Sequence, residues 1–80
     1  MYYVYILQSE TKPTELYKGF TEDLRARLNE HNQGNCDHTA KFRPWKMIYY
    51  CAFTDKKKAL DFEKYLKSAS GIAFMRKRLI

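Results

Sequence analysis

The side chains best suited to chemistry in this sequence fall where a helix usually places apolar residues. Four positions follow the i, i+3, i+4, i+7 spacing of one buried helical stripe: Leu24, Arg27, Leu28 and His31. Two of them are basic, and polar groups directed at an interior are costly unless paired. Arg27 and His31 could together clamp one oxyanion or phosphate. Taken alone, the pattern favours a plainer interpretation, in which Arg27 keeps its charged head in water and His31 is a satisfied, partly buried histidine.

A second stripe carries a carboxylate in the place of a core methyl group. Glu63 shares the helical spacing of Ala59 and Leu66. Such a carboxylate is rarely left unpaired, which leaves two uses open. It could form a salt bridge to Arg27 or Arg25, or it could be one ligand of a hard divalent cation such as Mg²⁺ or Mn²⁺. A single carboxylate would have to share that ion with water and a substrate phosphate.

Two tyrosines, Tyr5 and Tyr17, are expected on neighbouring strands of a hairpin. Tyrosine in a strand is usually a packing residue with good β-propensity. A phenol has a reference pKa of about 10, so it is a poor base at neutral pH unless a nearby cation stabilises the phenolate. Arg27 is the candidate for that cation, so the arrangement rather than the residue type would make these tyrosines functional.

The elements that must position these side chains can be read from turn and periodicity signals. A strand is predicted from Tyr2 to Gln8, a polar turn over residues 9–14, and a second strand antiparallel to the first from Glu15 to Phe20. Thr21 is the expected N-cap of a helix that runs to about Asn32, with Glu22 and Asp23 in its first turn.

The second half is predicted to contain one more strand and two helices. Residues 33–44 read as a basic loop, and Trp45 to Phe53 as a strand. Thr54 or Asp55 is expected to cap a helix that runs to about Lys67. The segment 68–71 breaks the periodicity, and residues 72–79 form a short final helix. The order β-β-α-β-α-α has too few strands to close a barrel, so helices must cover the sheet, which predicts an α+β fold.

Length and charge set the expected organisation. Eighty residues suit one compact domain covering 1–80. The net charge is +6, and residues 34–80 carry eleven Lys or Arg against four Asp or Glu. This clustering suggests a polyanionic partner, either nucleic acid or an anionic membrane surface. There is no bilayer-spanning run and no signal-peptide pattern, so we expect a cytoplasmic protein whose Cys36 and Cys51 remain thiols. The run Cys36-Asp37-His38 lacks the second ligand pair that a zinc site needs.

In order and spacing, these pieces resemble the GIY-YIG endonuclease superfamily, particularly its small single-domain bacterial members. The resemblance covers nearly the whole chain. It rests on Tyr3-Val4-Tyr5-Ile6-Leu7, Leu16-Tyr17-Lys18-Gly19-Phe20-Thr21, Asp23-Leu24-Arg25-Ala26-Arg27-Leu28, Glu30-His31-Asn32, Arg43-Pro44, Ile48-Tyr49-Tyr50, Ala59-Leu60 and Glu63-Lys64-Tyr65-Leu66-Lys67. Three positions depart from the family pattern: Tyr3 replaces the glycine of the first motif, Lys18 the isoleucine of the second, and Phe20 a lysine found in some repair-type relatives.

The resemblance implies a three-stranded antiparallel sheet flanked by helices, with a phosphodiesterase site on the face of the sheet. By position, Tyr5 matches the tyrosine of the first motif and Tyr17 that of the second. Arg27 matches the helix arginine, His31 a following position that holds His or Tyr, and Glu63 the metal-binding glutamate. The implied reaction is in-line hydrolysis of a phosphodiester, with Mg²⁺ or Mn²⁺ held by Glu63. Arg27 would offset charge on the phosphate, and Tyr5 or Tyr17, helped by His31, would accept the proton from water.

The expected substrate is DNA, with branched, damaged or single-stranded forms as the favoured targets. The candidate nucleic-acid-binding residues are Lys18, Arg25, Lys41, Arg43, Lys64 and Lys67. Two other functions stay open. One is a nucleic-acid-binding module with weak or lost catalysis, and the other is a catalytic subunit that needs a partner protein. DNA versus RNA, the preferred metal, the oligomeric state and the pathway are not decided by the sequence.

Overall fold

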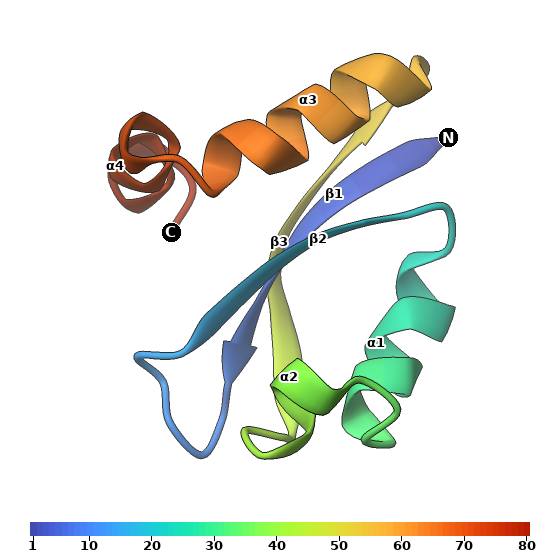
Figure 1. Cartoon of the computed structure of the whole chain (residues 1–80), viewed down its shortest axis with the longest axis vertical. Helices are drawn as coiled ribbons and strands as arrows, with labels where there is room; N and C mark the ends of the chain where they lie inside the picture. The colour runs from blue at the N-terminus through green and yellow to red at the C-terminus, as the bar shows by residue number, and fades with distance from the viewer.

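The computed structural model describes all residues, 1–80, as a twisted sheet with helices on both of its faces (Figure 1). The elements follow in the order β1 (Tyr2–Ser9), β2 (Leu16–Thr21), α1 (Leu24–Asn32), α2 (Asp37–Ala40), β3 (Trp45–Phe53), α3 (Lys56–Leu66) and α4 (Ala69–Arg78). The strands lie in the order β2-β1-β3 and both pairs are antiparallel. The expected α+β class and three-stranded antiparallel sheet are confirmed.

The central strand β1 separates two cores because its side chains alternate between the two faces of the sheet. Val4 and Ile6 are completely buried against α3 and α4, in a core that also contains Ala59, Leu66 and Met75. Tyr5 and Leu7 are buried on the opposite face, where Trp45, Tyr17, Leu24, Leu28, Phe42 and Met47 surround them. Figure 1 shows the same division, with α3 and α4 on one side of the sheet and α1 and α2 on the other.

A bulge in β3 keeps both cores filled. The pairing of β1 with β3 slips between Ile6 and Leu7, so that Ile6 lies opposite Tyr49 and Leu7 opposite Met47. One residue, Ile48, is therefore extra, and a bulge bends a strand at such a point. Ile48 and Tyr49 both pack on the α3 and α4 side, while Met47 stays on the α1 side with Leu7.

The N-terminus of α1 differs from the prediction. The N-cap is Asp23, whose side chain accepts a 3.0 Å hydrogen bond from the backbone N–H of Ala26. Thr21, the predicted cap, ends β2, and its hydroxyl accepts the backbone N–H of Asp23. Both residue types cap well, so the sequence allowed either one, and the length of β2 decides between them. Asp55 is the N-cap of α3, as one of the two alternatives predicted.

Two features of the second half were not predicted. The single-turn helix α2 lies inside the segment predicted to be a loop. Helix α4 begins at Ala69 instead of residue 72, with Ser68 as its N-cap accepting from the backbone N–H of Gly71. Gly71 is buried, and an added Cβ would lie on the carbonyl oxygen of Tyr65 and 2.8 Å from Cα of Leu66. This glycine therefore allows close packing of α4 on the end of α3, where the sequence suggested a break. None of the helices is both long and apolar enough to cross a membrane.

Candidate active site

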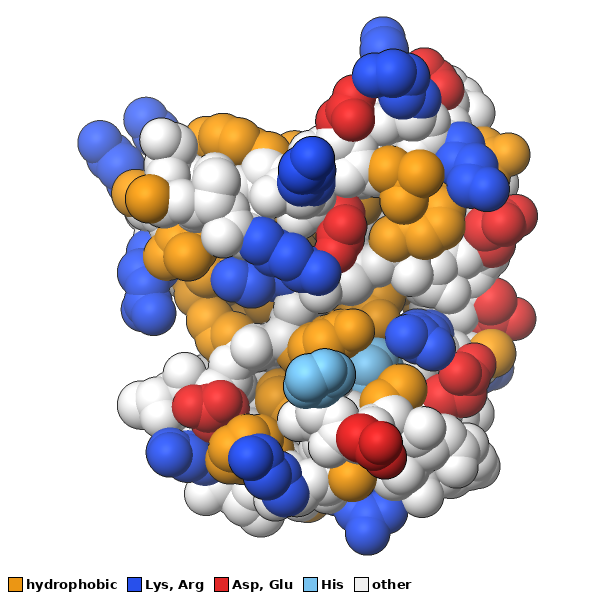
Figure 2. Space-filling view, viewed as in Figure 1, with side chains coloured by type: hydrophobic (Ala, Val, Ile, Leu, Met, Phe, Trp, Pro, Cys, Tyr) orange, Lys and Arg blue, Asp and Glu red, His pale blue; other side chains and the backbone are white.

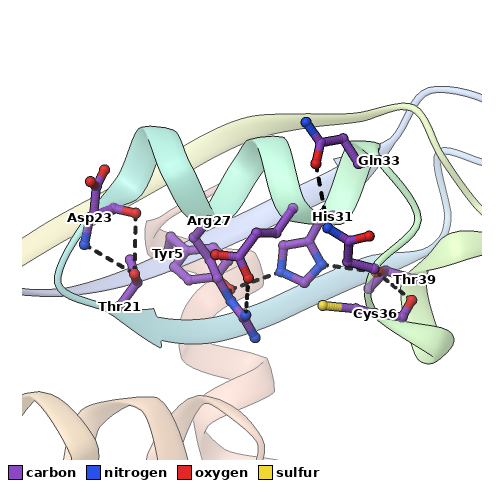
Figure 3. Close-up of polar contacts among 10 residues, drawn as sticks. Tyr5, Thr21, Asp23, Arg27, His31, Gln33, Cys36 and Thr39 are labelled. Atoms are coloured by element: carbon purple, nitrogen blue, oxygen red, sulfur yellow. Dashed lines mark hydrogen bonds and ion pairs between the residues drawn. The ribbon is translucent and has the colours of Figure 1, made fainter.

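Tyr5 is the centre of the candidate site, and Gly19 makes the space for it. The two residues lie opposite each other in the β1–β2 pairing. A Cβ added to Gly19 would collide with the hydroxyl of Tyr5 and lie 2.6 Å from its Cζ. The ring of Tyr5 therefore crosses the face of β2 at the one position without a side chain. The phenol is fully buried and its oxygen points toward α1 (Figure 3).

A chain of hydrogen bonds extends from Tyr5 to both sides (Figure 3). On one side, Nε of Arg27 donates to the Tyr5 hydroxyl at 3.3 Å, and Nη1 of Arg27 donates to Oε2 of Glu30 at 3.0 Å. On the other, the Tyr5 hydroxyl lies 3.0 Å from Nε2 of His31. Nδ1 of His31 lies 2.8 Å from the hydroxyl of Thr39, which donates to the carbonyl of Cys36 at 3.3 Å. Arg27 and His31 thus both contact the Tyr5 oxygen. As in the plainer interpretation of their spacing, His31 is a satisfied histidine, here fully buried, and Arg27 is partly exposed.

The surroundings of Tyr5 in this chain of hydrogen bonds keep its phenol protonated. Burial raises the pKa of Tyr5 to about 12, despite the opposing effect of the hydrogen bond from Arg27. The expectation that a nearby cation would stabilise the phenolate is therefore corrected: the contact is present, but desolvation outweighs it. Burial also lowers the pKa of His31, and the positive charge of Arg27 lowers it further, with Glu30 opposing. His31 is therefore neutral near pH 7 and can accept a proton.

Tyr17 lies beside this chain without joining it. Its ring centroid is 4.8 Å from that of His31 and 6.3 Å from that of Tyr5. Tyr17 is only partly buried, whereas Tyr5 and His31 have no exposed surface. No hydrogen bond within the protein holds the Tyr17 hydroxyl. The two tyrosines therefore have different positions, Tyr5 inside the chain of hydrogen bonds and Tyr17 at its rim.

Glu63 lies on α3, on the side of the sheet opposite α1. Its side chain is 18% exposed, and its ion-pair partner is Lys67, one turn further along. The salt bridge to Arg27 or Arg25 that was considered from the sequence is not formed, because Lys67 lies within reach at i+4 and Arg27 pairs with Glu30. No group of three or more His, Cys, Asp or Glu side chains is arranged to hold a metal ion. The residues present fit a divalent cation only as one carboxylate ligand, Glu63.

The edge strand β2 separates Glu63 from the other candidates. Tyr17 and Gly19 face α1 with Tyr5, while Lys18 between them faces the α3 side. Figure 2, in the orientation of Figure 1, shows histidine and hydrophobic side chains between β2 and α1, and basic and acidic side chains across β2 toward α3. A substrate that touched both Glu63 and Arg27 would therefore have to lie along the β2 edge.

The six predicted nucleic-acid-binding residues occupy several separate places. Lys18 lies near Lys67 and Arg76. Burial lowers the pKa of Lys18, and the positive charges of these two residues lower it further. Lys64 is exposed on α3. Lys41 lies with its Nζ 5.2 Å from the centre of the Phe42 ring.

The remaining two candidates lie apart from these. The guanidinium of Arg43 lies over Gly34, where an added Cβ would meet it. Arg25 lines an apolar groove of roughly 310 Å³ between α1 and β3, together with Leu24, Leu28, Met47 and Tyr50. The structure thus brings Lys18 and Lys67 together near Glu63, and it does not join the six into one surface.

Two residues of the site were missed by the sequence reasoning. Thr39 is 1% exposed and bonds to His31, yet it lies in a segment whose one-turn helix has no periodic signal. Gly19 was noted only as part of a motif, and its role depends on which residue lies opposite it in the sheet. A pair of hydrogen bonds at the end of α1 was also not predicted. The Asn32 side chain accepts from the backbone N–H of Trp45 at 2.6 Å and donates to the Trp45 carbonyl at 3.1 Å.

Comparisons with known proteins agree with this architecture. A model of the GIY-YIG catalytic domain matches residues 1–76. The chain is 39% identical over 67 residues to a UPF0213 protein of Lacticaseibacillus paracasei, covering 82% of this chain and 73% of that protein. A UPF0213 protein of Lactiplantibacillus plantarum is 39% identical over 75 residues, covering 90% and 72%. Structure-specific endonuclease subunit SLX1 of Scheffersomyces stipitis is 45% identical over 69 residues, covering 78% of this chain and 20% of that protein.

The chain belongs to the GIY-YIG family, and the match includes both tyrosine motifs and the two helices that carry Arg27 and Glu63. It spans most of the length of the bacterial relatives but only about a fifth of the SLX1 subunit. Membership of this family, together with the endonuclease relatives, supports a nuclease activity.

Proposed function

We propose that this protein is a divalent-metal-dependent endonuclease that hydrolyses phosphodiester bonds in DNA, with repair or recombination intermediates as its substrates. The observation that carries the proposal is the convergence of Arg27 and His31 on the buried hydroxyl of Tyr5. The neutral base beside the phenol oxygen can take the phenol proton, and the nearby cation can offset negative charge that develops during the reaction. The relatives named structure-specific endonuclease subunits support a substrate of particular structure.

In this proposal Tyr5 and His31 act as a pair. The Tyr5 hydroxyl passes its proton to Nε2 of His31 as its oxygen takes a proton from the attacking water. Arg27, which donates to the same oxygen in the free protein, would offset the negative charge on the substrate phosphate. This assignment favours Tyr5 over Tyr17 as the proton acceptor, because only Tyr5 is hydrogen-bonded to a base.

Access to Tyr5 requires a change when substrate binds, because its hydroxyl is buried in the free protein. Arg27 is the group that can move: its side chain is 32% exposed, and its bond to Tyr5 is longer than the bond from Tyr5 to His31. A phosphate at the β2 edge would attract the guanidinium, which would both neutralise the phosphate and open the Tyr5 oxygen to water. Tyr17, at the rim, would contact the substrate.

Glu63 would hold the Mg²⁺ or Mn²⁺ ion, with water and the substrate phosphate as the other ligands. When bound, the ion supplies a Lewis acid for the phosphate and the leaving oxygen. Lys67 must release Glu63 for this, and the substrate phosphates provide an alternative partner for its ammonium group. Lys18 and Lys67 would then hold the nucleic acid on the α3 side of the β2 edge.

Cleavage of a panel of single-stranded, duplex, flapped and four-way DNA, and of matched RNA, tests the proposal. Glu63→Ala should abolish cleavage stimulated by Mg²⁺ or Mn²⁺. Asp61→Ala is the matched control, because it removes a carboxylate that is exposed on the same helix and pairs only with Lys57. If neither variant differed from the wild type, the activity would belong to a contaminant. If no member were cleaved with either metal, the protein would instead be a binding module or a subunit that awaits its partner.

A further inference from the structure

Thr39 is a buried polar residue in the short helix α2. Its hydroxyl contacts two groups: Nδ1 of His31 at 2.8 Å and the backbone carbonyl of Cys36 at 3.3 Å. Its backbone carbonyl accepts the indole N–H of Trp45 at 2.9 Å, which fixes α2 against the start of β3. The side chain of Thr39 is thus held where it meets the far side of the His31 ring from Tyr5 (Figure 3).

The proton positions in this chain follow from the partners of Tyr5. The buried hydroxyl has two neighbours, Nε of Arg27, which can only donate, and Nε2 of His31. The Tyr5 proton must therefore point at Nε2, which acts as an acceptor. A neutral imidazole then carries its hydrogen on Nδ1, which donates to the Thr39 hydroxyl, and Thr39 donates in turn to the Cys36 carbonyl. Every donor and acceptor along the chain is satisfied in this one direction.

We propose that Thr39 is a positioning residue that holds His31 in the Nδ1–H tautomer, so that Nε2 stays free to take the proton of Tyr5. Its catalytic consequence rests on the proposed function, but the tautomer does not. The opposite tautomer would place a hydrogen on Nε2, leaving the Tyr5 proton without an acceptor and His31 unable to act as the base. The hydroxyl of Thr39 favours the Nδ1–H tautomer, because it donates its own hydrogen to the Cys36 carbonyl and its oxygen can then accept from Nδ1 of His31.

The test compares Thr39→Val, which keeps the shape and removes the hydroxyl, with Thr39→Ser, which keeps the hydroxyl. Both retain the backbone carbonyl that binds Trp45. Side-chain ¹H–¹⁵N correlation spectra of the free, ¹⁵N-histidine-labelled protein at pH 8 report which ring nitrogen carries the hydrogen. The exposed His38 supplies an internal reference in every spectrum.

His31 should be protonated at Nδ1 in the wild type and in Thr39→Ser. In Thr39→Val the buried Nδ1 hydrogen has no acceptor, so the Nε2–H form should appear beside the Nδ1–H form even though Tyr5 still needs Nε2 as an acceptor. Wild-type His31 protonated at Nε2 would overturn the proposal, even if Thr39→Val failed to fold. An unchanged tautomer in folded Thr39→Val would overturn it equally.

Single-turnover cleavage supplies the second measurement. Thr39→Val should lower the rate of the chemical step by about 10²-fold with substrate binding unchanged, and Thr39→Ser should restore most of it. An equal loss in both variants, or a loss confined to substrate binding, would contradict a positioning role. If the wild type cleaved nothing, the proposed function would fail, whereas the tautomer result would still decide the role of Thr39.

Discussion

Replacing Gly19 with alanine tests the packing on which the site depends. The new methyl group would overlap the hydroxyl of Tyr5 and lie 2.6 Å from Cζ of the same ring. Real Cβ atoms do not approach other atoms so closely, so the ring or the strand must move. The ring is fully buried between β2 and α1, and its hydroxyl is held by Arg27 and His31, so little free space is available.

The expected loss of stability follows from two opposing effects. Overpacking a buried site costs about 1 to 3 kcal/mol. Replacing a strand glycine by alanine returns about 0.5 to 1 kcal/mol, because glycine loses more backbone entropy on folding. The two effects leave a net loss of about 0 to 2.5 kcal/mol, and the severe overlap with a buried ring places Gly19→Ala in the upper part of that range, at about 1 to 2.5 kcal/mol. The hydrogen bonds of Tyr5 should be broken or lengthened at the same time.

Urea unfolding of Gly19→Ala, Tyr5→Phe and the double variant measures this effect. Tyr5→Phe removes the atom nearest to the new methyl group, so the double variant should lose less than the sum of the single losses. The coupling free energy should be about 0.5 kcal/mol or more. If Gly19→Ala were as stable as the wild type, or if the two losses simply added, the Tyr5 ring would not lie over Gly19 and the reasoning would be refuted.

Three further predictions concern stability. The pKa of His31 is lowered on folding, so as the pH falls the unfolded chain binds a proton at this histidine before the folded protein does. The unfolding free energy should therefore fall as the pH drops below about 6.5, and His31→Asn should flatten this dependence; an unchanged dependence in His31→Asn would contradict the assignment. Ser68→Ala should lower the unfolding free energy by about 0.5 to 2 kcal/mol because it removes the cap of α4. Ser70→Ala, at an exposed position, should change it by less, and equal effects of the two substitutions in urea unfolding would contradict the assigned cap. Gly71→Ala should lower the thermal midpoint more than Ser68→Ala does, because its methyl group would meet rigid backbone at the end of α3, and a midpoint equal to that of the wild type would disprove this contact.

The sequence predicted the elements that have strong local signals. All three strands and the helices α1 and α3 follow from apolar alternation or periodicity, and Arg27 and His31, which share one helical stripe, both contact the Tyr5 oxygen. Helix α2 was missed because its four residues are held by tertiary bonds through Thr39 rather than by a periodic pattern. The start of α4 was missed because Gly71 usually signals a break, whereas here it permits close helix contact.

The remaining errors concern charge and burial. Glu63 pairs with Lys67, a local i, i+4 contact, instead of the arginines predicted as its partners. The pKa of Tyr5 depends on how deeply its ring is buried, and on whether desolvation exceeds the effect of Arg27. Neither quantity can be obtained from residue spacing, because both depend on what the whole fold places around the phenol.

In the proposed function, the hydroxyl of Tyr5, between Arg27 and His31, moves the proton of phosphodiester hydrolysis. The most direct test is single-turnover cleavage of the best DNA substrate by Tyr5→Phe beside Tyr2→Phe, which removes a strand-β1 hydroxyl that has no hydrogen-bond partner in the protein. Tyr5→Phe should lower the rate of the chemical step by about 10²- to 10⁴-fold with DNA binding retained, and Tyr2→Phe should cleave as the wild type does. Full activity in a folded Tyr5→Phe protein would contradict this role of Tyr5.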